Sequence, residues 1–174
     1  MLSTRRSLRP CHARFSAACA GSLIALALAL ALAGCSEPAA GERTVARVTK
    51  HTDGDTLWLS GIGKVRLIGI DTPEVSGQAE CYGREASAFV ERTVPLGSEV
   101  RYRLGVDERD RYGRALAYLW LEDGRFLNRL LVARGYAQPL TVPPNVEYAD
   151  RFARVARRAR EAGRGLWGRR GCSG

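Results

Sequence analysis

The stretch VRLIGIDTPE, residues 65–74, combines the pattern of a β-strand with charged residues at its end. Its branched apolar residues favour a strand, and Pro73 removes a backbone donor and forces a turn. Arg66, Asp71 and Glu74 are therefore expected to meet where the strand ends. Turns of this composition are also common in ordinary loops, so the stretch indicates a site only if other motifs agree with it.

The spacing within this stretch sets a geometric condition. Arg66 and Asp71 are five residues apart, so in a straight strand their Cα atoms would lie about 17 Å from each other. Both can serve one ligand only if the strand curls, as barrel strands do, and if Arg66 reaches along it. Gly69 is the residue that permits such a bend.

Two further motifs place charged groups in turns. Residues 53–56, DGDT, put Asp53 and Asp55 into a tight turn between two expected strands, where carboxylates can bind a hard cation. Residues 110–114, DRYGR, bring a phenol and a guanidinium to the start of another strand. Each motif also has a plain structural interpretation, as a hairpin turn or as an exposed charged loop.

Hydrophobic periodicity predicts one α+β domain, mainly β, over residues 43–168. Strands are expected at 43–50, at 56–59, at the start of the opening stretch, at 97–104 and at 114–121, with helices at 83–93, from 127 to before 135, and at 146–162. Five strands with a helix between the third and the fourth match a closed Greek-key barrel of the oligonucleotide/oligosaccharide-binding (OB) type. The predicted fold is therefore a five-stranded OB-fold barrel with three helices.

The first 34 residues have the composition of an export signal. Arginines at positions 5, 6, 9 and 14 precede an apolar run at 17–33, and LAGC at 32–35 resembles the lipobox of bacterial lipoproteins. We expect residues 1–34 to be a signal peptide, Cys35 to be lipidated, and residues 35–42 to form the lipidated cysteine and a tether. An ordinary cleaved signal, an uncleaved anchor and a twin-arginine signal are the alternatives.

Removal of residues 1–34 takes away four arginines and no acidic residue, so the formal net charge falls from +9 to +5. A basic surface suits phosphates or an anionic membrane, although a preference for arginine in the coding sequence would give the same composition. Cys81 and Cys172 then remain as one pair in an oxidising compartment, which favours a disulfide that ties down the tail at 169–174. Two free buried thiols are the alternative.

Four motifs occur together in a fixed order: DGDT, RLIGIDTPE, YGREASAF and DRYGRALAY. This combination resembles the staphylococcal nuclease (thermonuclease) family over about residues 43–167. The resemblance implies an OB-type barrel and a calcium-dependent phosphodiesterase of low sequence selectivity. Its partners would be single-stranded or locally opened DNA, with RNA as a further substrate, and its products would carry 3′-phosphate ends.

The family's site residues can be placed on matching positions of this sequence. The resemblance implies carboxylate ligands to calcium at Asp55 and Asp71, a backbone carbonyl ligand at Thr72, and Asp53 close by through water. It implies a general base at Glu74, phosphate-binding cations at Arg66 and Arg114, and nucleotide contacts from Tyr112 and Arg111. The chain departs from the family at Leu140 and Val142, where relatives carry two tyrosines that flank the base.

A non-catalytic nucleic-acid-binding module of the cell envelope is the alternative function. Loss of catalysis would be expected to show as substitution of Arg66, Glu74 or Arg114, and all three are present. We expect an exported monomer, held at a membrane by lipid on Cys35 or secreted. Ser36 after the cysteine favours the outer membrane if the cell is diderm.

Overall fold

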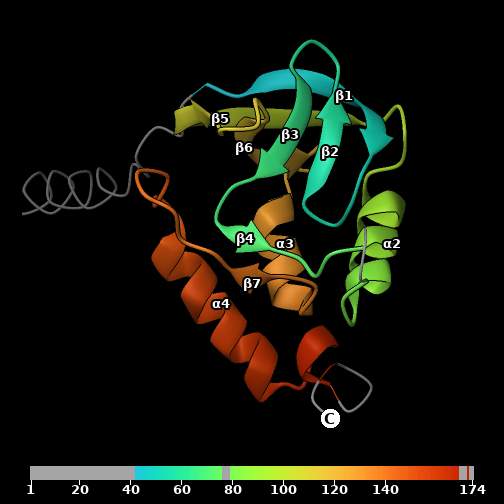
Figure 1. Ribbon diagram of the computed structural model, residues 1–174, viewed down its shortest axis with the longest axis vertical. Helices are drawn as coiled ribbons and strands as arrows, with labels where there is room; N and C mark the ends of the chain where they lie inside the picture. Colours follow the sequence, from blue (N-terminus) through green and yellow to red (C-terminus); the bar gives the residue numbers. More distant parts are fainter. Residues whose placement is uncertain (1–41, 76–78, 169–171, 173–174) are drawn as a thin grey trace, which may run out of the picture. The chain divides into compact units, whose positions relative to one another are not determined.

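A computed structural model describes residues 42–75, 79–168 and 172 of the chain. Among them are the strands β1 (Thr44–His51), β2 (Thr56–Leu59), β3 (Gly63–Leu67), β5 (Glu99–Arg109) and β6 (Ala115–Leu121). These five strands close into a barrel in the order β1-β2-β3-β6-β5 (Figure 1). The predicted five-stranded barrel of a mainly β fold is confirmed. The predicted signal and Cys35 lie outside the described residues.

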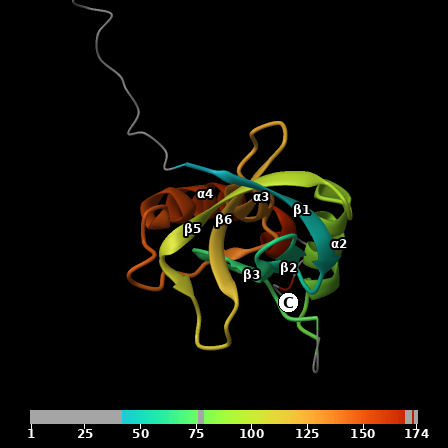
Figure 2. The same cartoon turned by 90° about the horizontal axis from the view of Figure 1, so that it is seen from above.

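The barrel is a mixed sheet. Strands β1, β2 and β3 form an antiparallel meander, β3 pairs in parallel with β6, and β5 pairs antiparallel with both β6 and β1. Alternation along β3 turns Val65 and Leu67 into the core, so Lys64 and Arg66 lie on the outer face of the barrel. The hairpin that joins β5 to β6 carries residues 110–114 and projects from the barrel (Figure 2).

Three α-helices and a short 3₁₀ helix pack around the barrel in the described part of the chain. They are α2 (Gly83–Thr93), α3 (Leu127–Arg134), α4 (Ala149–Glu161) and η1 (Gly165–Trp167). Helix α2 has the bounds that the sequence predicts, but α4 begins three residues later than expected. The reason is local: Asn145 forms a bridge with Val142, and the backbone N–H of Val146 donates to the Pro144 carbonyl, so this segment is a turn.

The opening stretch is not one continuous strand. It breaks after Leu67 and resumes as β4 (Ile70–Asp71), which pairs antiparallel with β7 (Gln138–Pro139). Gly69 takes a φ of 79° at the break, a conformation that favours glycine. An added Cβ on Gly69 would lie 2.6 Å from the ring of Phe152 on α4. The predicted bend is therefore present, and it also makes room for α4.

A buried asparagine, Asn128, also fixes this bend in the chain. Asn128 at the start of α3 accepts a hydrogen bond from the backbone N–H of Leu119 at 3.0 Å and donates to the carbonyl of Ile68 at 2.9 Å. These bonds satisfy backbone groups that the break in the strand would otherwise leave unpaired in the core. Helix α3 thus fixes where the chain leaves the barrel. No described helix is long and apolar enough to cross a membrane.

Candidate active site

Arg66 links two carboxylates that come from different turns. Its Nη1 forms an ion pair with Asp55, and its Nη2 donates to Oδ1 of Asp71 at 2.6 Å. The Arg66 side chain is only 14% exposed, whereas the Asp71 side chain is 56% exposed. The bend at Gly69 brings Asp71 back toward Arg66, so the two residues meet at the end of β3. Because both of its Nη groups are held, the Arg66 guanidinium has a fixed plane and orientation.

Asp55 is the buried member of the pair. Its Oδ2 accepts hydrogen bonds from the backbone N–H of Thr72 at 2.8 Å and from the Thr72 hydroxyl at 3.0 Å, and its Oδ1 accepts from Thr56. Burial raises the pKa of Asp55 to about 6; Arg66 lowers it in part, and Asp53 raises it further. Burial therefore outweighs the favourable contact with Arg66 in setting the pKa of this carboxyl group.

The turn that carries Asp55 is packed tightly against the turn that carries Thr72. The backbone N–H of Asp55 donates to Oδ1 of Asp53 at 3.1 Å, which shapes the turn. A Cβ on Gly54 would lie 2.9 Å from the side chain of Thr72. Glycine at position 54 therefore lets the two acidic turns approach each other.

Arg114 is oriented by an acidic residue on its own hairpin. Its Nε donates to Oδ2 of Asp110 at 2.6 Å, and the backbone N–H groups of Tyr112 and Arg114 both donate to Oδ1 of Asp110. Burial raises the pKa of Asp110, but these hydrogen bonds outweigh burial and leave the pKa below its usual value. Asp110 thus binds the Nε side of the Arg114 guanidinium and makes no hydrogen bond with its two Nη groups.

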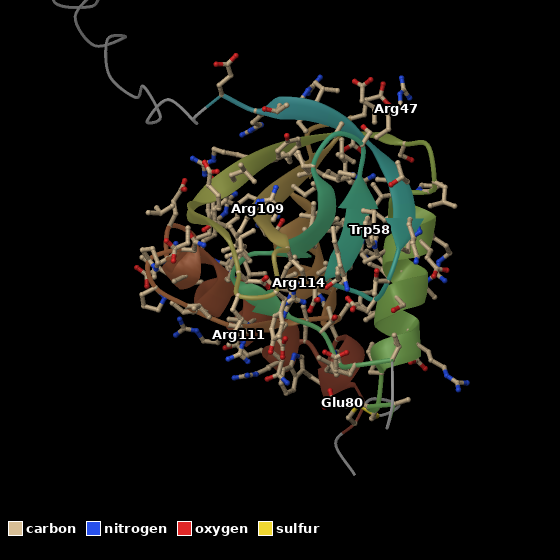
Figure 3. The ribbon with its side chains drawn as sticks, turned by 45° about the horizontal axis from the view of Figure 1, so that its top comes forward. Arg47, Trp58, Glu80, Arg109, Arg111 and Arg114 are labelled. Carbon is tan, nitrogen blue, oxygen red and sulfur yellow. A yellow bond between two sulfur atoms is a disulfide. The ribbon has the colours of Figure 1, made fainter. Side chains whose placement is uncertain are left out.

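Tyr112 and Arg111 lie at the tip of the same hairpin. The Tyr112 side chain is 68% exposed, and the Arg114 guanidinium carbon lies 5.5 Å from the centre of its ring. Arg111 donates to the Tyr112 hydroxyl at 2.6 Å and also stacks on the ring. Figure 3 labels Arg111 and Arg114 on neighbouring parts of this hairpin. The structure therefore brings Tyr112 and Arg111 beside Arg114.

Glu74 is exposed and lies three residues after Asp71 in the chain. In the described part of the chain its carboxylate makes no hydrogen bond or ion pair, so its side chain is not held against Arg66 or Arg114. Its backbone is held: the Glu74 N–H donates to Glu80 at 3.1 Å, and the Glu80 N–H donates back to the Glu74 carbonyl at 2.9 Å. The backbone position is fixed, and the carboxylate has freedom to turn.

One cavity of about 250 Å³ is lined by both Arg66 and Arg114, and its lining does not include Asp55, Asp71, Thr72, Glu74, Arg111 or Tyr112. Arg66, Arg114, Asp107 and Asp110 line its polar side, and Leu140 and Val142 contribute to an apolar side. Asn145 holds this apolar segment, because its side chain accepts from the Asp107 N–H at 3.1 Å and donates to the Asp107 carbonyl at 3.0 Å. Two guanidiniums beside an apolar wall can bind an anion attached to a flat or apolar group.

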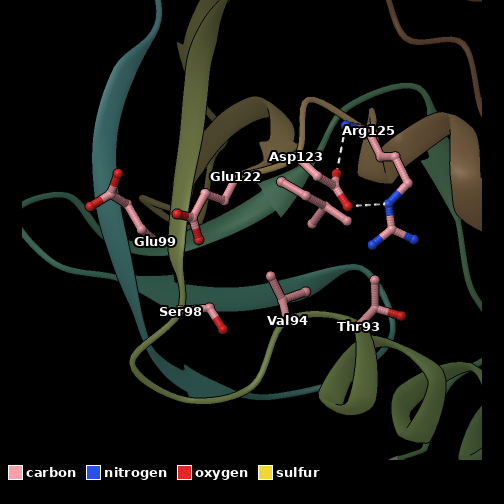
Figure 4. Close-up of a pocket in the computed structure, with 8 residues that line it drawn as sticks. Thr93, Val94, Ser98, Glu99, Glu122, Asp123 and Arg125 are labelled. Carbon is pink, nitrogen blue, oxygen red and sulfur yellow. Dashed lines mark hydrogen bonds and ion pairs between the residues drawn. The ribbon is translucent and has the colours of Figure 1, made fainter.

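A larger hollow of about 440 Å³ lies elsewhere on the barrel (Figure 4). It is acidic, with Glu99, Glu122 and Asp123 on its wall, and its Arg125 is bound to Asp123 at 2.6 Å. Its charge is wrong for an anion, so the smaller cavity is the better candidate site.

The cysteines that the sequence pairs are joined in the structure. Cys81, just before α2, and Cys172 form a disulfide with their Cα atoms 5.7 Å apart. This bond ties a residue of the tail to the segment that follows Glu80. Cys172 is thereby attached next to Glu80, the residue that holds the Glu74 backbone.

Four residues that support the site were missed as site residues in the sequence: Glu80, Asp110, Asn128 and Asn145. Asn128 had the clearest signal, because an asparagine within an apolar helical stripe must find buried partners. Asp110 was visible as the first residue of the DRYGR motif, but only the hairpin geometry shows that it binds Arg114. Glu80 and Asn145 bind backbone groups of other residues, and such contacts leave no pattern in the sequence.

The fold and the site define a class of protein: an OB-type barrel with two oriented arginines on the wall of one cavity. A family model described as staphylococcal nuclease homologue matches residues 64–169. A thermonuclease of Staphylococcus hyicus is 36% identical over 134 residues, which are 74% of this chain and 78% of that protein. A thermonuclease of Staphylococcus intermedius is 34% identical, over 70% of this chain and 75% of that protein.

The endonuclease YncB of Bacillus subtilis is a further relative, 34% identical over 68% of this chain and 59% of that protein. The model match and the identity to the thermonucleases are sufficient to assign the family. This chain belongs to the staphylococcal nuclease homologue family.

Proposed function

We propose that this protein is a nuclease that hydrolyses phosphodiester bonds in DNA and RNA with low sequence selectivity. The observation that carries the proposal is the pair of guanidiniums, Arg66 and Arg114, on the wall of one cavity. Its relatives named thermonuclease and endonuclease support the same activity. The nucleic acid would be single-stranded or locally opened, because the cavity is too small to take a duplex.

The two arginines suit the charge that develops during hydrolysis. A phosphodiester attacked in line by water accumulates negative charge on its equatorial oxygens, and each guanidinium can donate paired hydrogen bonds to them. Asp110 holds Arg114 before substrate arrives, and in the metal-free protein Arg66 is held by Asp55 and Asp71. Preorganised donors of this kind lower the barrier because they need little rearrangement during the reaction.

Calcium is the proposed cofactor. Among the described residues, no group of three or more histidine, cysteine, aspartate and glutamate side chains converges on a metal position. The donors still fit a hard cation, because calcium also accepts backbone carbonyls and water, and the carboxylates of Asp55 and Asp71 meet at one guanidinium, that of Arg66. Asp55, Asp71 and the Thr72 carbonyl would hold the ion, with Asp53 close by. When bound, calcium supplies Lewis-acid polarisation of a phosphate oxygen.

Glu74 is the proposed base. Its carboxylate is exposed and has no partner among the described residues, so it can turn toward a water molecule beside the phosphate and orient it for attack. Its backbone, held by Glu80, keeps the side chain near the site. Attack on the side opposite the 5′ oxygen would leave a 3′-phosphate end. Tyr112 and Arg111 would contact the nucleotide from the hairpin.

We further propose how the chain is delivered. Residues 1–34 would act as an export signal, Cys35 would carry the lipid that holds the protein at a membrane, and residues 35–42 would serve as the tether. The catalytic domain would be a monomer over residues 43–168, with the tail at 169–174 tied by the disulfide of Cys81 and Cys172.

The test is hydrolysis of single-stranded DNA and RNA by the purified protein, with calcium and with a chelator. Degradation with calcium that disappears with the chelator is expected. Replacing one arginine, as in Arg114→Gln, should raise the barrier by about 3 kcal/mol, roughly a hundredfold in rate. Full activity in an Arg66→Ala, Glu74→Gln double variant would refute the site assignment. Binding of nucleic acid without any hydrolysis by the native protein would instead favour a non-catalytic binding module.

A further inference from the structure

We infer that Lys50, Trp58 and Lys64 form a second nucleic-acid contact, which binds the strand next to the nucleotide held in the cavity. This set of three residues is called the Trp58 row. The inference rests on the proposed function, because it extends the path of the same substrate. It concerns residues outside the site described so far.

The Trp58 row is set by strand register. Trp58 on β2 is the direct partner of Lys50 on β1 and of Lys64 on β3, so the three residues lie side by side across the antiparallel meander. All three side chains are outside the barrel, since their neighbours Leu57, Leu59 and Val65 are buried. They include the only two lysines of the chain.

Trp58 is unusually exposed for a side chain of its size. Its side chain is 36% exposed, and Figure 3 shows it beside β2 rather than inside the barrel. The Lys50 amine lies 5.8 Å from the centre of the ring, which is a contact at the outer limit for a cation and an aromatic ring. A lysine at that distance can move at little cost, so the ring remains available to a flat ligand.

The same strands lead from the Trp58 row into the cavity. Lys64 and Arg66 are two residues apart on β3 and share its outer face, about 7 Å from each other. Trp58 is paired with Lys64, and two residues along the same pair of strands Thr56 is paired with Arg66. A strand with its reacting phosphate at Arg66 can therefore continue over Lys64 and Trp58 without crossing another element of the sheet.

The chemistry of the Trp58 row fits a single-stranded nucleic acid. Aromatic rings stack on bases with little preference for sequence, and lysines bind the phosphates between them. Two cations flank one ring, which matches the alternation of charge and flat base along the strand. Glu91 lies beside Lys50 in a shallow hollow and weakens its attraction for phosphate. Lys64 should consequently contribute more to binding than Lys50.

The experiment measures binding without turnover. A Glu74→Gln protein in a chelator is titrated with a dinucleotide and with an oligothymidine of about twelve nucleotides, a length within the usual range for one OB fold. Fluorescence anisotropy of a dye attached to each ligand measures binding by every variant, quenching of tryptophan fluorescence reports contact with Trp58 where it is present, and a gel verifies that the oligonucleotide stays intact. Trp58 dominates the signal change if the inference is right, because Trp120 is buried and Trp167 lies on η1 under the Arg160 guanidinium, outside the three strands that carry the Trp58 row.

In this background, Trp58→Ala should weaken binding of the long oligonucleotide by about 5- to 100-fold, while Trp58→Phe should retain most of the affinity. The dinucleotide should bind the alanine variant as before, since it does not reach the Trp58 row. Lys64→Gln should reduce the slope of log affinity against log salt by about 0.7.

An Arg157→Gln, Arg158→Gln pair serves as the control for lost charge. Both arginines are exposed on α4, outside the three-stranded face. Equal weakening by this pair and by Lys50→Gln, Lys64→Gln would refute the inference, as would unchanged binding of the long oligonucleotide by Trp58→Ala. Vesicles containing anionic lipid are tested in parallel, and binding of vesicles but not oligonucleotide through Trp58 would also refute it. Failure of the proposed nuclease activity is a separate result, seen as no hydrolysis by the native protein with calcium.

Discussion

Arg66 donates a hydrogen bond of 2.6 Å to Asp71, although five residues separate them in the chain. In a straight strand their Cα atoms would be about 17 Å apart. The contact exists because β3 stops at Leu67, Gly69 turns the chain with a positive φ, and Asp71 resumes pairing in β4. A break in one strand thus joins the phosphate-binding and metal-binding parts of the proposed site.

This relationship predicts that Gly69→Ala will be costly. A left-handed conformation is unfavourable for alanine by about 1 kcal/mol, and the added Cβ would lie 2.6 Å from the Phe152 ring. Because Phe152 is fully buried in the core, it cannot move away freely. We expect the free energy of unfolding to fall by about 2–4 kcal/mol, measured by urea denaturation.

Gly61→Ala is the matched control. Gly61 has a φ of 81°, close to that of Gly69, but an added Cβ would meet nothing within 4 Å. Its loss of stability should therefore stay near the backbone cost of about 1 kcal/mol. Equal losses at the two positions would mean that the contact with Phe152 does not restrict position 69.

Arg66 occupies carboxylate oxygens that the proposed calcium ion also needs. The guanidinium contacts Asp55 and Asp71 directly, so it competes with a divalent cation for the same negative charge. Arg66→Gln should bind calcium more tightly, by about tenfold or more, even though it should lose most of its activity. Calorimetric titration of the metal measures the affinity.

Arg114→Gln provides the comparison for this prediction. Its guanidinium pairs with Asp110 instead of the proposed metal ligands. Both variants lose one positive charge at the cavity, but only the Arg66 variant frees carboxylate oxygens. A similar gain in calcium affinity for both would point to a general electrostatic effect and against direct competition.

Asp110→Asn should reduce activity by releasing Arg114. The carboxylate holds both Nε of Arg114 and the backbone of the hairpin, and an amide is a weaker partner for a guanidinium. We expect kcat/KM to fall by about tenfold, with more of the loss in kcat if the interaction matters most in the transition state. Steady-state hydrolysis of single-stranded DNA separates the two parameters.

Asp123→Asn repeats this change outside the site. Asp123 binds Arg125 with nearly the same geometry, through Nε at 2.6 Å and the backbone N–H at 3.0 Å. Both variants lose a carboxylate that orients an arginine, but only Asp110 acts on the cavity. Loss of activity in both variants would indicate a general loss of stability rather than a role for Asp110 in positioning.

The sequence was sufficient for the features that depend on local pattern. Helix α2 was predicted with its observed bounds, because its apolar positions have helical spacing and Pro95 follows its end. The barrel was predicted from strand alternation and from the family resemblance. The need for a bend at Gly69 followed from the distance that Arg66 must reach.

Other features could not be predicted because they depend on pairing between distant segments. Strands β4 and β7 contain two residues each, which is too short to show alternation. Arg66 was assigned to a phosphate, and its direct contact with both acidic turns depends on where Asp55 and Asp71 meet in space. The late start of α4 reflects the turn at Asn145, whose partner Asp107 lies 38 residues away.

Asp55 predicts a pH dependence of stability in the metal-free protein. Its pKa in the folded state is about 6, above the ordinary value of 3.8, chiefly because the carboxyl group is buried. The folded state therefore binds this proton more tightly than the unfolded state does. The resulting contribution to the free energy of unfolding is fully present below pH 3.8 and is lost as the pH rises through 6.

This loss of stability amounts to about 3 kcal/mol at most. It should be measurable in a chelator as the difference in the free energy of unfolding between the wild type and Asp55→Asn across the pH range. The asparagine variant has a constant cost from its altered hydrogen bonds to Thr72, but it lacks this titration, so its stability should depend less on pH. Calcium should reverse the trend in the wild type, because the ion binds the ionised carboxylate and stabilises the folded state above pH 6. Parallel pH profiles for the two proteins in chelator would show that burial does not raise the pKa of Asp55 in the folded protein.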